Sequence, residues 1–164
     1  MNSLVSLLTE QDILPSVSAD SRKAALIALA KRLAEQTGID HHDIFEGIIE
    51  RERLGSTGVG HGVAIPHTRI EGLERPIGAL ARLITPVDFD AIDDEHCDLV
   101  FMLIAPESAG ADHLRALARV SRAFRAPAIR DALRSAASQA EMFAILCPDT
   151  ADVSPTPEPL QRRA

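Results

Sequence analysis

Hydrophobic residues recur at helical spacing along two stretches in the first third of the chain. Over Ser21–Gln36, the side chains of Leu26, Ala30 and Leu33 fall on one face, and Asp40–Glu52 repeats the same spacing. Intervals of three and four residues bring side chains onto one side of an α-helix, so that this side can pack against a core. Both stretches are therefore predicted to form amphipathic helices.

Three further helices are predicted in the last third of the chain. Asp112–Arg125 has helical periodicity, and Pro127 suits the first turn of another helix, where a missing N–H is tolerated. Ser138 and Glu141 have the spacing of a capping box, which opens a last short helix that runs through Leu146.

Three apolar segments between these helices have the character of strands. Val63–Ile65 is short, Pro76–Ile84 alternates weakly, and Asp98–Ala105 is a continuous apolar run that indicates a strand buried on both faces. Helices that flank a small sheet of mixed strand order predict an α/β fold, a three-layer-like sandwich around a central mixed β-sheet. We expect this domain over residues 1–147, followed by a proline-rich, disordered tail over residues 148–164.

Composition narrows the class of protein. The 164 residues suffice for one domain with a core, which is aliphatic because the chain has no Trp or Tyr and five Phe. It has neither an apolar run long enough to span a membrane nor a secretory signal, so we expect a cytoplasmic protein. The net charge of −7 argues against nucleic-acid binding, which relies on Lys and Arg. Cys97 and Cys147 lack metal-ligand spacing and are expected to be buried, reduced thiols.

The segment Arg51–Thr68 contains the clearest candidate for chemistry. It holds four of the nine glycines, and glycine lets backbone N–H groups converge on one point. After the short strand it reaches Pro66 and His67, and proline restricts its own φ and that of its neighbour. We therefore expect His67 at the end of a strand on a stiff stem, where it is a candidate nucleophile or ligand.

His113 is the second candidate. It shares an apolar stripe with Leu117, Val120 and Phe124 on the predicted helix Asp112–Arg125, and it lies in the first turn. The helix dipole at that end disfavours a protonated imidazole. Two interpretations stay open, because His113 is either a hydrogen-bonded core histidine or the partner of a second presented histidine.

The other four histidines, His41, His42, His61 and His96, are expected to be ordinary polar residues. His61 and His67 could be interpreted as a metal pair, but their spacing across a turn and a strand fixes no geometry. No Cys or carboxylate nearby completes a familiar ligand pattern, so we expect no metal site.

Groups that suit a phosphoryl oxygen are close to His67 in the sequence. They are the hydroxyls of Ser56 and Thr57, the backbone of Gly58, and the guanidinium of Arg51, with Arg53 and Arg69 as further arginines. The other interpretation of the arginines is a solvated surface. A neutral imidazole nitrogen attacks an activated phosphoryl group and forms a phosphoramidate that can be passed on. The glycine-rich loop matches neither the P-loop nor the GxGxxG fingerprint, so the sequence does not support a nucleotide site. Together, the loop, the hydroxyls, the arginines and a second histidine predict phosphoryl transfer through histidine with no cofactor.

Two segments, LGSTGVG at 54–60 and GVAIPH at 62–67, carry a family resemblance. They resemble the active-site signature of the IIA proteins of the bacterial phosphotransferase system, fructose/mannitol class, and within it the nitrogen-regulatory subclass (IIA-Ntr, PtsN-like). Further matches lie at 85–93, 98–101 and 113–118, and the similarity is collinear over roughly residues 4–147.

The resemblance implies a role for each of three residues. It implies that His67 forms a phosphohistidine by accepting a phosphoryl group from a carrier protein of the HPr/NPr type. It also implies that His113 is the neighbouring active-site histidine and that Arg51 assists the phosphoryl group. Thr68 and His61 depart from the family pattern, where glycine is frequent at the first position and Asn or another polar residue is expected at the second. Both changes could reshape the carrier's docking surface.

Three functions remain open. The first is a regulatory phosphoryl acceptor whose phosphorylation state is read by partners such as transporters or sensor kinases, and the subclass resemblance favours it. The second is a sugar-specific subunit that passes the phosphoryl group to a IIB partner for fructose or mannitol uptake. The third is a non-catalytic binding module or a metal protein.

A row of four arginines on the helix Asp112–Arg125 also has two interpretations. Arg115, Arg119, Arg122 and Arg125 fall within one broad face opposite the apolar stripe, on an otherwise acidic protein. Such a face is usually solvated, and the alternative is a docking surface for an acidic partner.

Overall fold

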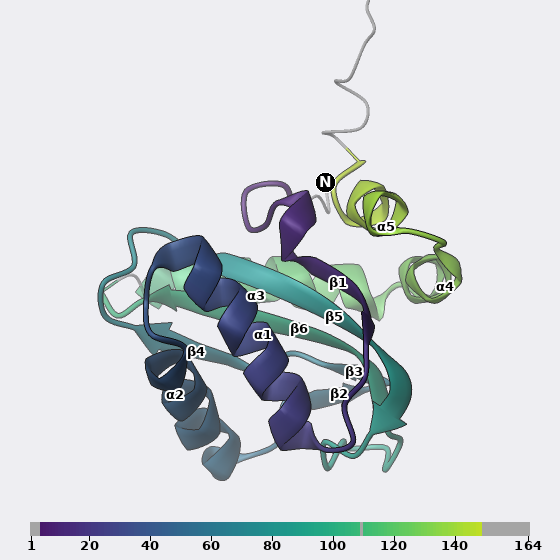
Figure 1. Ribbon diagram of the computed structural model, residues 1–164, viewed down its shortest axis with the longest axis horizontal. Coiled ribbons are helices and arrows are strands. Elements are labelled where there is room, and N and C mark those ends of the chain that lie inside the picture. Colours follow the sequence, from purple (N-terminus) through teal and green to yellow (C-terminus); the bar gives the residue numbers. More distant parts are fainter. Residues whose placement is uncertain (1–3, 109, 149–164) are drawn as a thin grey trace, which may run out of the picture.

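The computed structural model describes residues 4–108 and 110–148, which form a six-stranded mixed sheet with helices on both faces (Figure 1). The strands are β1 (Ile13–Val17), β2 (Gly58–Gly60), β3 (Val63–Ala64), β4 (His67–Ile70), β5 (Ile77–Val87) and β6 (Cys97–Pro106). The helices are the 3-10 turn η1 (Glu10–Asp12), α1 (Arg22–Thr37), α2 (His41–Leu54), α3 (Gly110–Arg125), α4 (Pro127–Ser135) and α5 (Gln139–Leu146). The predicted α/β sandwich with a central mixed sheet is confirmed. The tail was expected over residues 148–164, and all of it except Pro148 lies outside the described residues.

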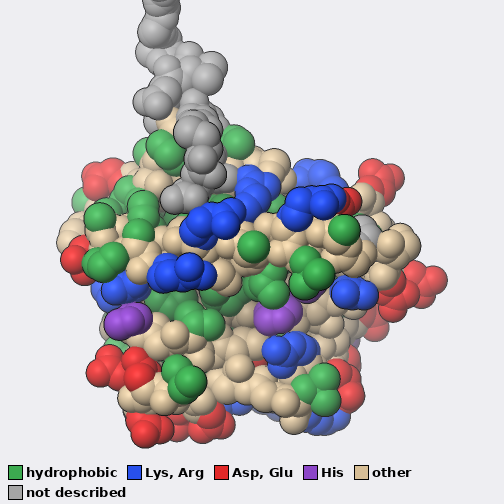
Figure 2. Space-filling model, turned by 180° about the vertical axis from the view of Figure 1, so that it is seen from behind, with side chains coloured by type: hydrophobic (Ala, Val, Ile, Leu, Met, Phe, Trp, Pro, Cys, Tyr) green, Lys and Arg blue, Asp and Glu red, His purple; other side chains and the backbone are tan. Residues whose placement is uncertain are grey.

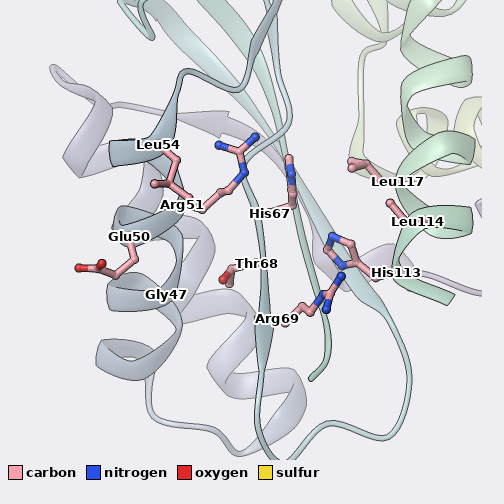
Figure 3. Close-up of a pocket in the computed structure, with 10 residues that line it drawn as sticks. All are labelled: Gly47, Glu50, Arg51, Leu54, His67, Thr68, Arg69, His113, Leu114 and Leu117. Carbon is pink, nitrogen blue, oxygen red and sulfur yellow. The ribbon is translucent and has the colours of Figure 1, made fainter. Parts of the chain in front are cut away.

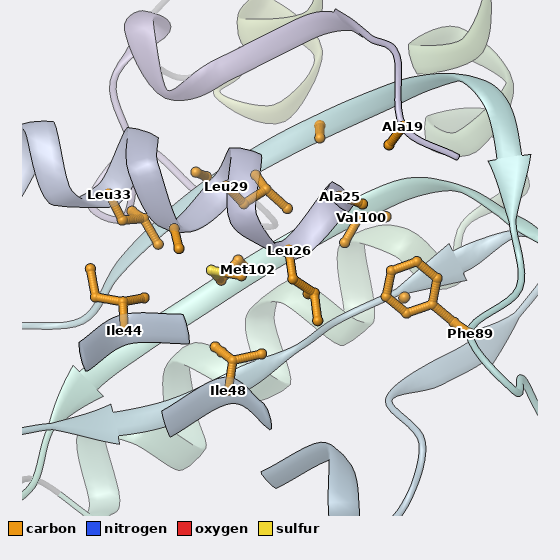
Figure 4. Packing of buried hydrophobic residues seen from close by; sticks show 14 of the residues in the cluster. Ala19, Ala25, Leu26, Leu29, Leu33, Ile44, Ile48, Phe89, Val100 and Met102 are labelled. Carbon is orange, nitrogen blue, oxygen red and sulfur yellow. The ribbon is translucent and has the colours of Figure 1, made fainter. Parts of the chain in front are cut away.

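β6 is the strand around which the sheet is built. It pairs antiparallel with β5 on one side, and on the other side it pairs parallel with β3 and then with β4. Successive side chains of a strand point to opposite faces. Val100 and Met102 accordingly belong to the core beneath α1 and α2 (Figure 4), whereas Leu99 and Phe101 belong to the core that includes residues of α3, α4 and α5. The prediction of a strand buried on both faces is confirmed.

Side-chain caps explain where the helices begin. The Ser21 hydroxyl accepts a hydrogen bond from the Ala24 N–H at 3.1 Å, and the Asp40 carboxylate accepts one from the His42 N–H at 2.8 Å. Ser138 accepts the Glu141 N–H at 3.1 Å. Such bonds satisfy N–H groups that have no partner within a helix. The five predicted helices therefore form close to their predicted bounds.

Four strands differ from the prediction, because β1, β2 and β4 have no predicted counterpart and β5 is longer than expected. Pro15 interrupts the pattern of β1, but proline is tolerated in a strand that pairs on one side only. β5 extends past the predicted end at Ile84 to Val87 and includes Pro86. The pairing of β5 with β6 shifts register between Arg82 and Val87, and such irregular pairing accommodates a proline that has no N–H.

Candidate functional site

An open pocket of about 550 Å³ lies beside β4, at the edge of the sheet where α2 and α3 approach from opposite faces (Figure 3). Its walls carry His67, Thr68 and Arg69 from β4, Arg51 from α2, and His113 from the first turn of α3. The fold thus brings together Arg51, His67 and His113, which are distant in sequence and which were predicted to act together.

His67 is the first residue of β4. This corrects the expectation that His67 lies at the end of a strand. β3 stops at Ala64, Ile65 and Pro66 bridge the gap, and His67 then starts β4 opposite Leu103 of β6. The bridge leaves the Ile65 carbonyl oxygen 2.7 Å from Nδ1 of the His67 ring. A carbonyl oxygen accepts only, so Nδ1 carries the proton and Nε2 of the neutral ring has a free lone pair.

The surroundings of His67 favour its neutral form. Partial burial lowers the pKa of His67 below its ordinary value of 6.5, the hydrogen bond to Ile65 opposes this, and the charge of Arg51 lowers it further. Burial penalises the charged form of an imidazole, and a nearby cation adds to that penalty. The ring is therefore neutral near pH 7, which is the state that a nucleophile requires.

His113 lies next to His67. Only 6% of His113 is exposed, and its ring centroid lies 5.7 Å from that of His67, with the ring planes tilted by 49°. Burial lowers the pKa of His113, and His67 and Arg69 lower it further. Its Nδ1 is buried with no hydrogen-bond partner among the described residues, which does not fit a satisfied core histidine.

Arg51 reaches the pocket from the last turn of α2. Its Nη1 donates to the carbonyl oxygen of Gly55 at 3.0 Å, and Figure 3 shows its guanidinium extending toward His67. A cation is favoured at this end of a helix because the carbonyl groups there carry partial negative charge. Arg51 is thereby held beside the imidazole without an acidic partner that would neutralise it among the described residues.

The hydroxyl groups of the glycine-rich loop do not reach the pocket. The Thr57 hydroxyl donates to the buried carboxylate of Glu52, and the Ser56 hydroxyl donates to the Phe89 carbonyl oxygen while accepting the Gly58 N–H at 3.0 Å. These three residues are absent from the pocket lining. The structure therefore gives these hydroxyl groups a visible role in holding the loop against α2 and the segment after β5.

Gly58 shows why this loop requires glycine. A Cβ atom at this position would lie 2.8 Å from Cβ and 2.9 Å from Cα of Ala91. Carbon atoms in contact normally stay about 3.5–4.0 Å apart, so a larger side chain would force the two segments apart. The glycine thus permits close packing.

The remaining histidines and one of the arginines lie away from the pocket lining. His61 occupies the turn between β2 and β3 with φ of 59°, where its N–H donates to Asp93 and its carbonyl oxygen accepts from Arg134. His42 and His96 are exposed and His41 starts α2. The exposed Arg53 pairs with Glu50. Within residues 4–108 and 110–148, no group of three or more His, Cys, Asp or Glu could hold a metal ion.

Several pocket residues were not assigned a role by sequence reasoning. Leu54 is 84% exposed and Leu114 is 62% exposed, so two large apolar side chains lie in the pocket rim in contact with water. Arg69 was noted as one of three nearby arginines, but no spacing rule separated it from the exposed Arg53. The alternation of side chains along a strand would have placed it on the same side of β4 as His67, had β4 been predicted.

The arginine face of α3 forms largely as expected. Arg115, Arg122 and Arg125 are exposed, while Arg119 is half-buried and donates to the Ser6 hydroxyl at 3.0 Å. Figure 2, which views the molecule from the side of α3, shows basic side chains gathered in a band. Whether an acidic partner docks there stays a prediction, and the simultaneous charge reversal of Arg115 and Arg119 is expected to weaken such binding.

Comparison with known proteins agrees with this arrangement. The family described as the phosphoenolpyruvate-dependent sugar phosphotransferase system, EIIA 2, matches residues 6–147. A nitrogen regulatory protein of Bradyrhizobium diazoefficiens is 44% identical over 143 residues, which cover 87% of this chain and 94% of that protein. The crystal structure of nitrogen regulatory protein IIA-Ntr from Neisseria meningitidis has a TM-score of 0.82 at 37% identity, covering 88% of this chain and 99% of that one.

A more distant structure shares the fold alone. It is enzyme IIA mannitol of Escherichia coli, solved in complex with phosphorylated enzyme IIB mannitol, with a TM-score of 0.72 at 17% identity over 85% of this chain and 98% of that one.

The chain belongs to the EIIA type 2 family of the phosphoenolpyruvate-dependent sugar phosphotransferase system. The resemblance inferred from the LGSTGVG and GVAIPH segments is thus confirmed, including its nitrogen-regulatory subclass. Proteins of this family are phosphoryl carriers, which gives the chain a transferase role in general terms. Among the described residues, no helix has the length and apolar character needed to cross a membrane.

Proposed function

We propose that Nε2 of His67 accepts a phosphoryl group from a phosphohistidine carrier of the HPr/NPr type. We propose in addition that the chain regulates protein partners through its phosphorylation state. The observation that carries this proposal is the hydrogen bond from Nδ1 of His67 to the Ile65 carbonyl oxygen. It leaves Nε2 as the nucleophilic nitrogen of a neutral ring that lines an open pocket.

The transfer exchanges one N–P bond for another. The lone pair on Nε2 of His67 attacks phosphorus, and the electron pair of the breaking N–P bond returns to the imidazole of the carrier. The Nδ1 proton stays on His67 and its hydrogen bond to Ile65 strengthens as the ring becomes more positive. The product is a phosphohistidine, and the reaction requires neither a metal nor another cofactor from this chain.

Arg51 and His113 assist this step from two sides of His67. Catalysis of phosphoryl transfer consists mainly of positioning and of stabilising charge on the three equatorial oxygens. The planar guanidinium of Arg51 suits two of those oxygens, and its bond to Gly55 fixes it in place beforehand. His113 supplies a neutral ring close to His67, whose single N–H is available to a phosphoryl oxygen.

The regulatory output rests on the relatives. The curated proteins from Bradyrhizobium diazoefficiens and Pseudomonas aeruginosa are called nitrogen regulatory proteins, at 44% and 40% identity. The alternative is a sugar-specific subunit that passes the phosphoryl group to a IIB protein, as the solved complex of the Escherichia coli mannitol enzymes illustrates for that protein. Both functions use His67 in the same way, so only the identity of the acceptor separates them.

The intact mass of the protein tests the proposal. The chain is incubated with phosphoenolpyruvate, enzyme I and an HPr-type or NPr-type carrier, with His67→Ala treated in parallel. We expect one acid-labile phosphoryl adduct on the natural chain and none on His67→Ala. The absence of an adduct with either carrier would favour a non-catalytic binding module. Rapid passage of the adduct to a fructose-type or mannitol-type IIB protein would favour sugar uptake over regulation.

A further inference from the structure

Arg69 lies on the same side of β4 as His67. The two residues are separated by one position, and alternate side chains of a strand share a face. Thr68, between them, turns toward α2, because its Cγ2 lies 3.1 Å from where a Cβ on Gly47 would stand. Arg69 therefore points, like His67, toward α3.

The guanidinium of Arg69 reaches the start of α3 beside His113. Its Nη2 lies 3.7 Å from the place where a Cβ on Gly110 would stand, and its charge helps to lower the pKa of His113. Figure 3 shows Arg69 extending toward His113, and Arg51 on the other side of His67. The two guanidinium groups thus approach the His67–His113 pair from different elements.

The charge of Arg69 is not neutralised within the described part of the chain. Its side chain makes no ion pair or hydrogen bond with residues 4–108 or 110–148, whereas Arg53 and Arg115, also exposed, pair with acidic neighbours. Glu50, an acidic residue of the pocket lining, is the partner of Arg53. The pocket therefore holds two cations that lack acidic partners, next to two neutral histidines.

His113 adds an independent observation at the same pocket. Its buried Nδ1 lacks a hydrogen-bond partner among the described residues, and such an atom calls for an explanation, for example a catalytic role or an unseen water or ion. A phosphoryl group on His67 would bring three acceptor oxygens into the space between this ring and the two arginines.

We propose that Arg69 is a further catalytic residue, which binds the phosphoryl oxygens during transfer to His67, on the side opposite Arg51. The inference rests on the proposed function, because it assigns a role in the same reaction. Arg69 forms hydrogen bonds and an ion pair with the phosphoryl group, and no covalent bond to it forms or breaks. Two arginines thus bind the phosphoryl oxygens from different elements, Arg51 from α2 and Arg69 from β4, the strand that carries His67.

The test uses Arg69→Gln and Arg69→Lys, with Arg75→Gln as the matched control. Arg75 is an exposed arginine outside the pocket lining, and it donates to the Ser6 carbonyl oxygen. The single-turnover rate of transfer from the phosphorylated carrier is measured as a function of carrier concentration. We expect Arg69→Gln to lower the rate at saturating carrier by about tenfold or more, Arg69→Lys to recover part of it, and Arg75→Gln to match the natural chain.

The outcomes separate this inference from the proposed function. If the natural chain takes up no phosphoryl group, the proposed function fails. If the natural chain is phosphorylated and Arg69→Gln reaches the same saturating rate, the role of Arg69 is overturned and the proposed function stands. A higher half-saturating carrier concentration at an unchanged saturating rate would also overturn it, because Arg69 would then serve docking. Circular dichroism and urea unfolding confirm that each variant is folded.

Discussion

The Nδ1–H of His67 donates to the carbonyl oxygen of Ile65, two residues earlier, at 2.7 Å. This bond joins the nucleophile to the backbone segment that connects β3 to β4. It selects the tautomer of the ring and its orientation together, because only one nitrogen can face that oxygen. The chemistry of the pocket thus depends on the short break between two strands that both pair with β6.

The pH dependence of phosphorylation should report the lowered pKa of His67. Burial and the charge of Arg51 lower this pKa below 6.5. The ring therefore stays neutral to a lower pH than an ordinary imidazole, and the midpoint of the decline in rate that protonation of His67 causes should lie below pH 6.5. The charged and titratable groups that face the ring are Arg51 from α2, Arg69 from β4 and His113 from α3. Glu50 also lines the pocket, but its carboxylate pairs with Arg53.

NMR titration of the His67 ring provides the measurement for this prediction. We expect a midpoint below 6.5 in the natural chain and a higher midpoint in Arg51→Gln, because that variant removes a cation that disfavours protonation. A midpoint at or above 6.5 in the natural chain would show that the ring is not desolvated as the structure indicates.

His113→Ala should leave the fold and the nucleophile intact but slow the transfer. The ring lies 5.7 Å from His67, where its N–H can stabilise charge on a phosphoryl oxygen. Loss of one such donor lowers rates by about 100-fold in well-ordered sites, and we expect a decrease of about tenfold or more here. His42→Ala, an exposed histidine outside the pocket lining, is the control. Equal single-turnover rates in both variants would remove His113 from the mechanism.

The loop hydroxyls should matter for stability more than for transfer. Thr57→Val leaves the buried Glu52 carboxylate without its hydroxyl donor and with Arg22 at 3.6 Å as its remaining partner. An unsatisfied buried group costs about 1–3 kcal/mol, so the free energy of unfolding in urea should fall by that amount. Ser56→Ala should cost less, since its bond to Phe89 involves no charge.

The same two variants also test the sequence-based expectation for the loop. If Ser56 and Thr57 bound the phosphoryl group, their removal would lower the saturating transfer rate while stability stayed nearly unchanged. The bonds to Phe89 and Glu52 favour the reverse result.

His61 should be replaceable by asparagine but not by a β-branched residue. Its φ of 59° lies in the left-handed region, which Asn adopts readily and which disfavours side chains branched at Cβ. We expect His61→Asn to leave the free energy of unfolding nearly unchanged and His61→Val to lower it by about 1–2 kcal/mol. Slower phosphorylation of an equally stable His61→Asn protein would instead indicate a direct part in carrier docking.

The sequence predicts the fold well where the pattern is local. Helical spacing around Leu26 and the apolar run of β6 reflect burial within one element, so both are visible in the sequence alone. β1 and β4 are short, and their stability comes from pairing with strands distant in the chain, namely β5 and β6. The residues within β1 and β4 do not reveal which distant strand each of them pairs with.

The site divides in the same way. His67 and His113 stand out because each departs from its apolar surroundings, and both line the pocket. The direction of the Ser56 hydroxyl depends on Phe89, 33 residues later, so the sequence offered no reason to turn it away from the pocket. Arg69 could be separated from Arg53 only once β4 had fixed its direction.

The most direct test of the central claim locates the phosphoryl group on the ring of His67. Nitrogen-15 and phosphorus-31 NMR of the freshly phosphorylated protein distinguish attachment at Nε2 from attachment at Nδ1. Because Nδ1 donates to the Ile65 carbonyl oxygen, we expect one signal from Nε2-phosphohistidine at His67 and none in His67→Ala. Phosphorylation at Nδ1, or at another residue, would contradict the mechanism derived from this hydrogen bond.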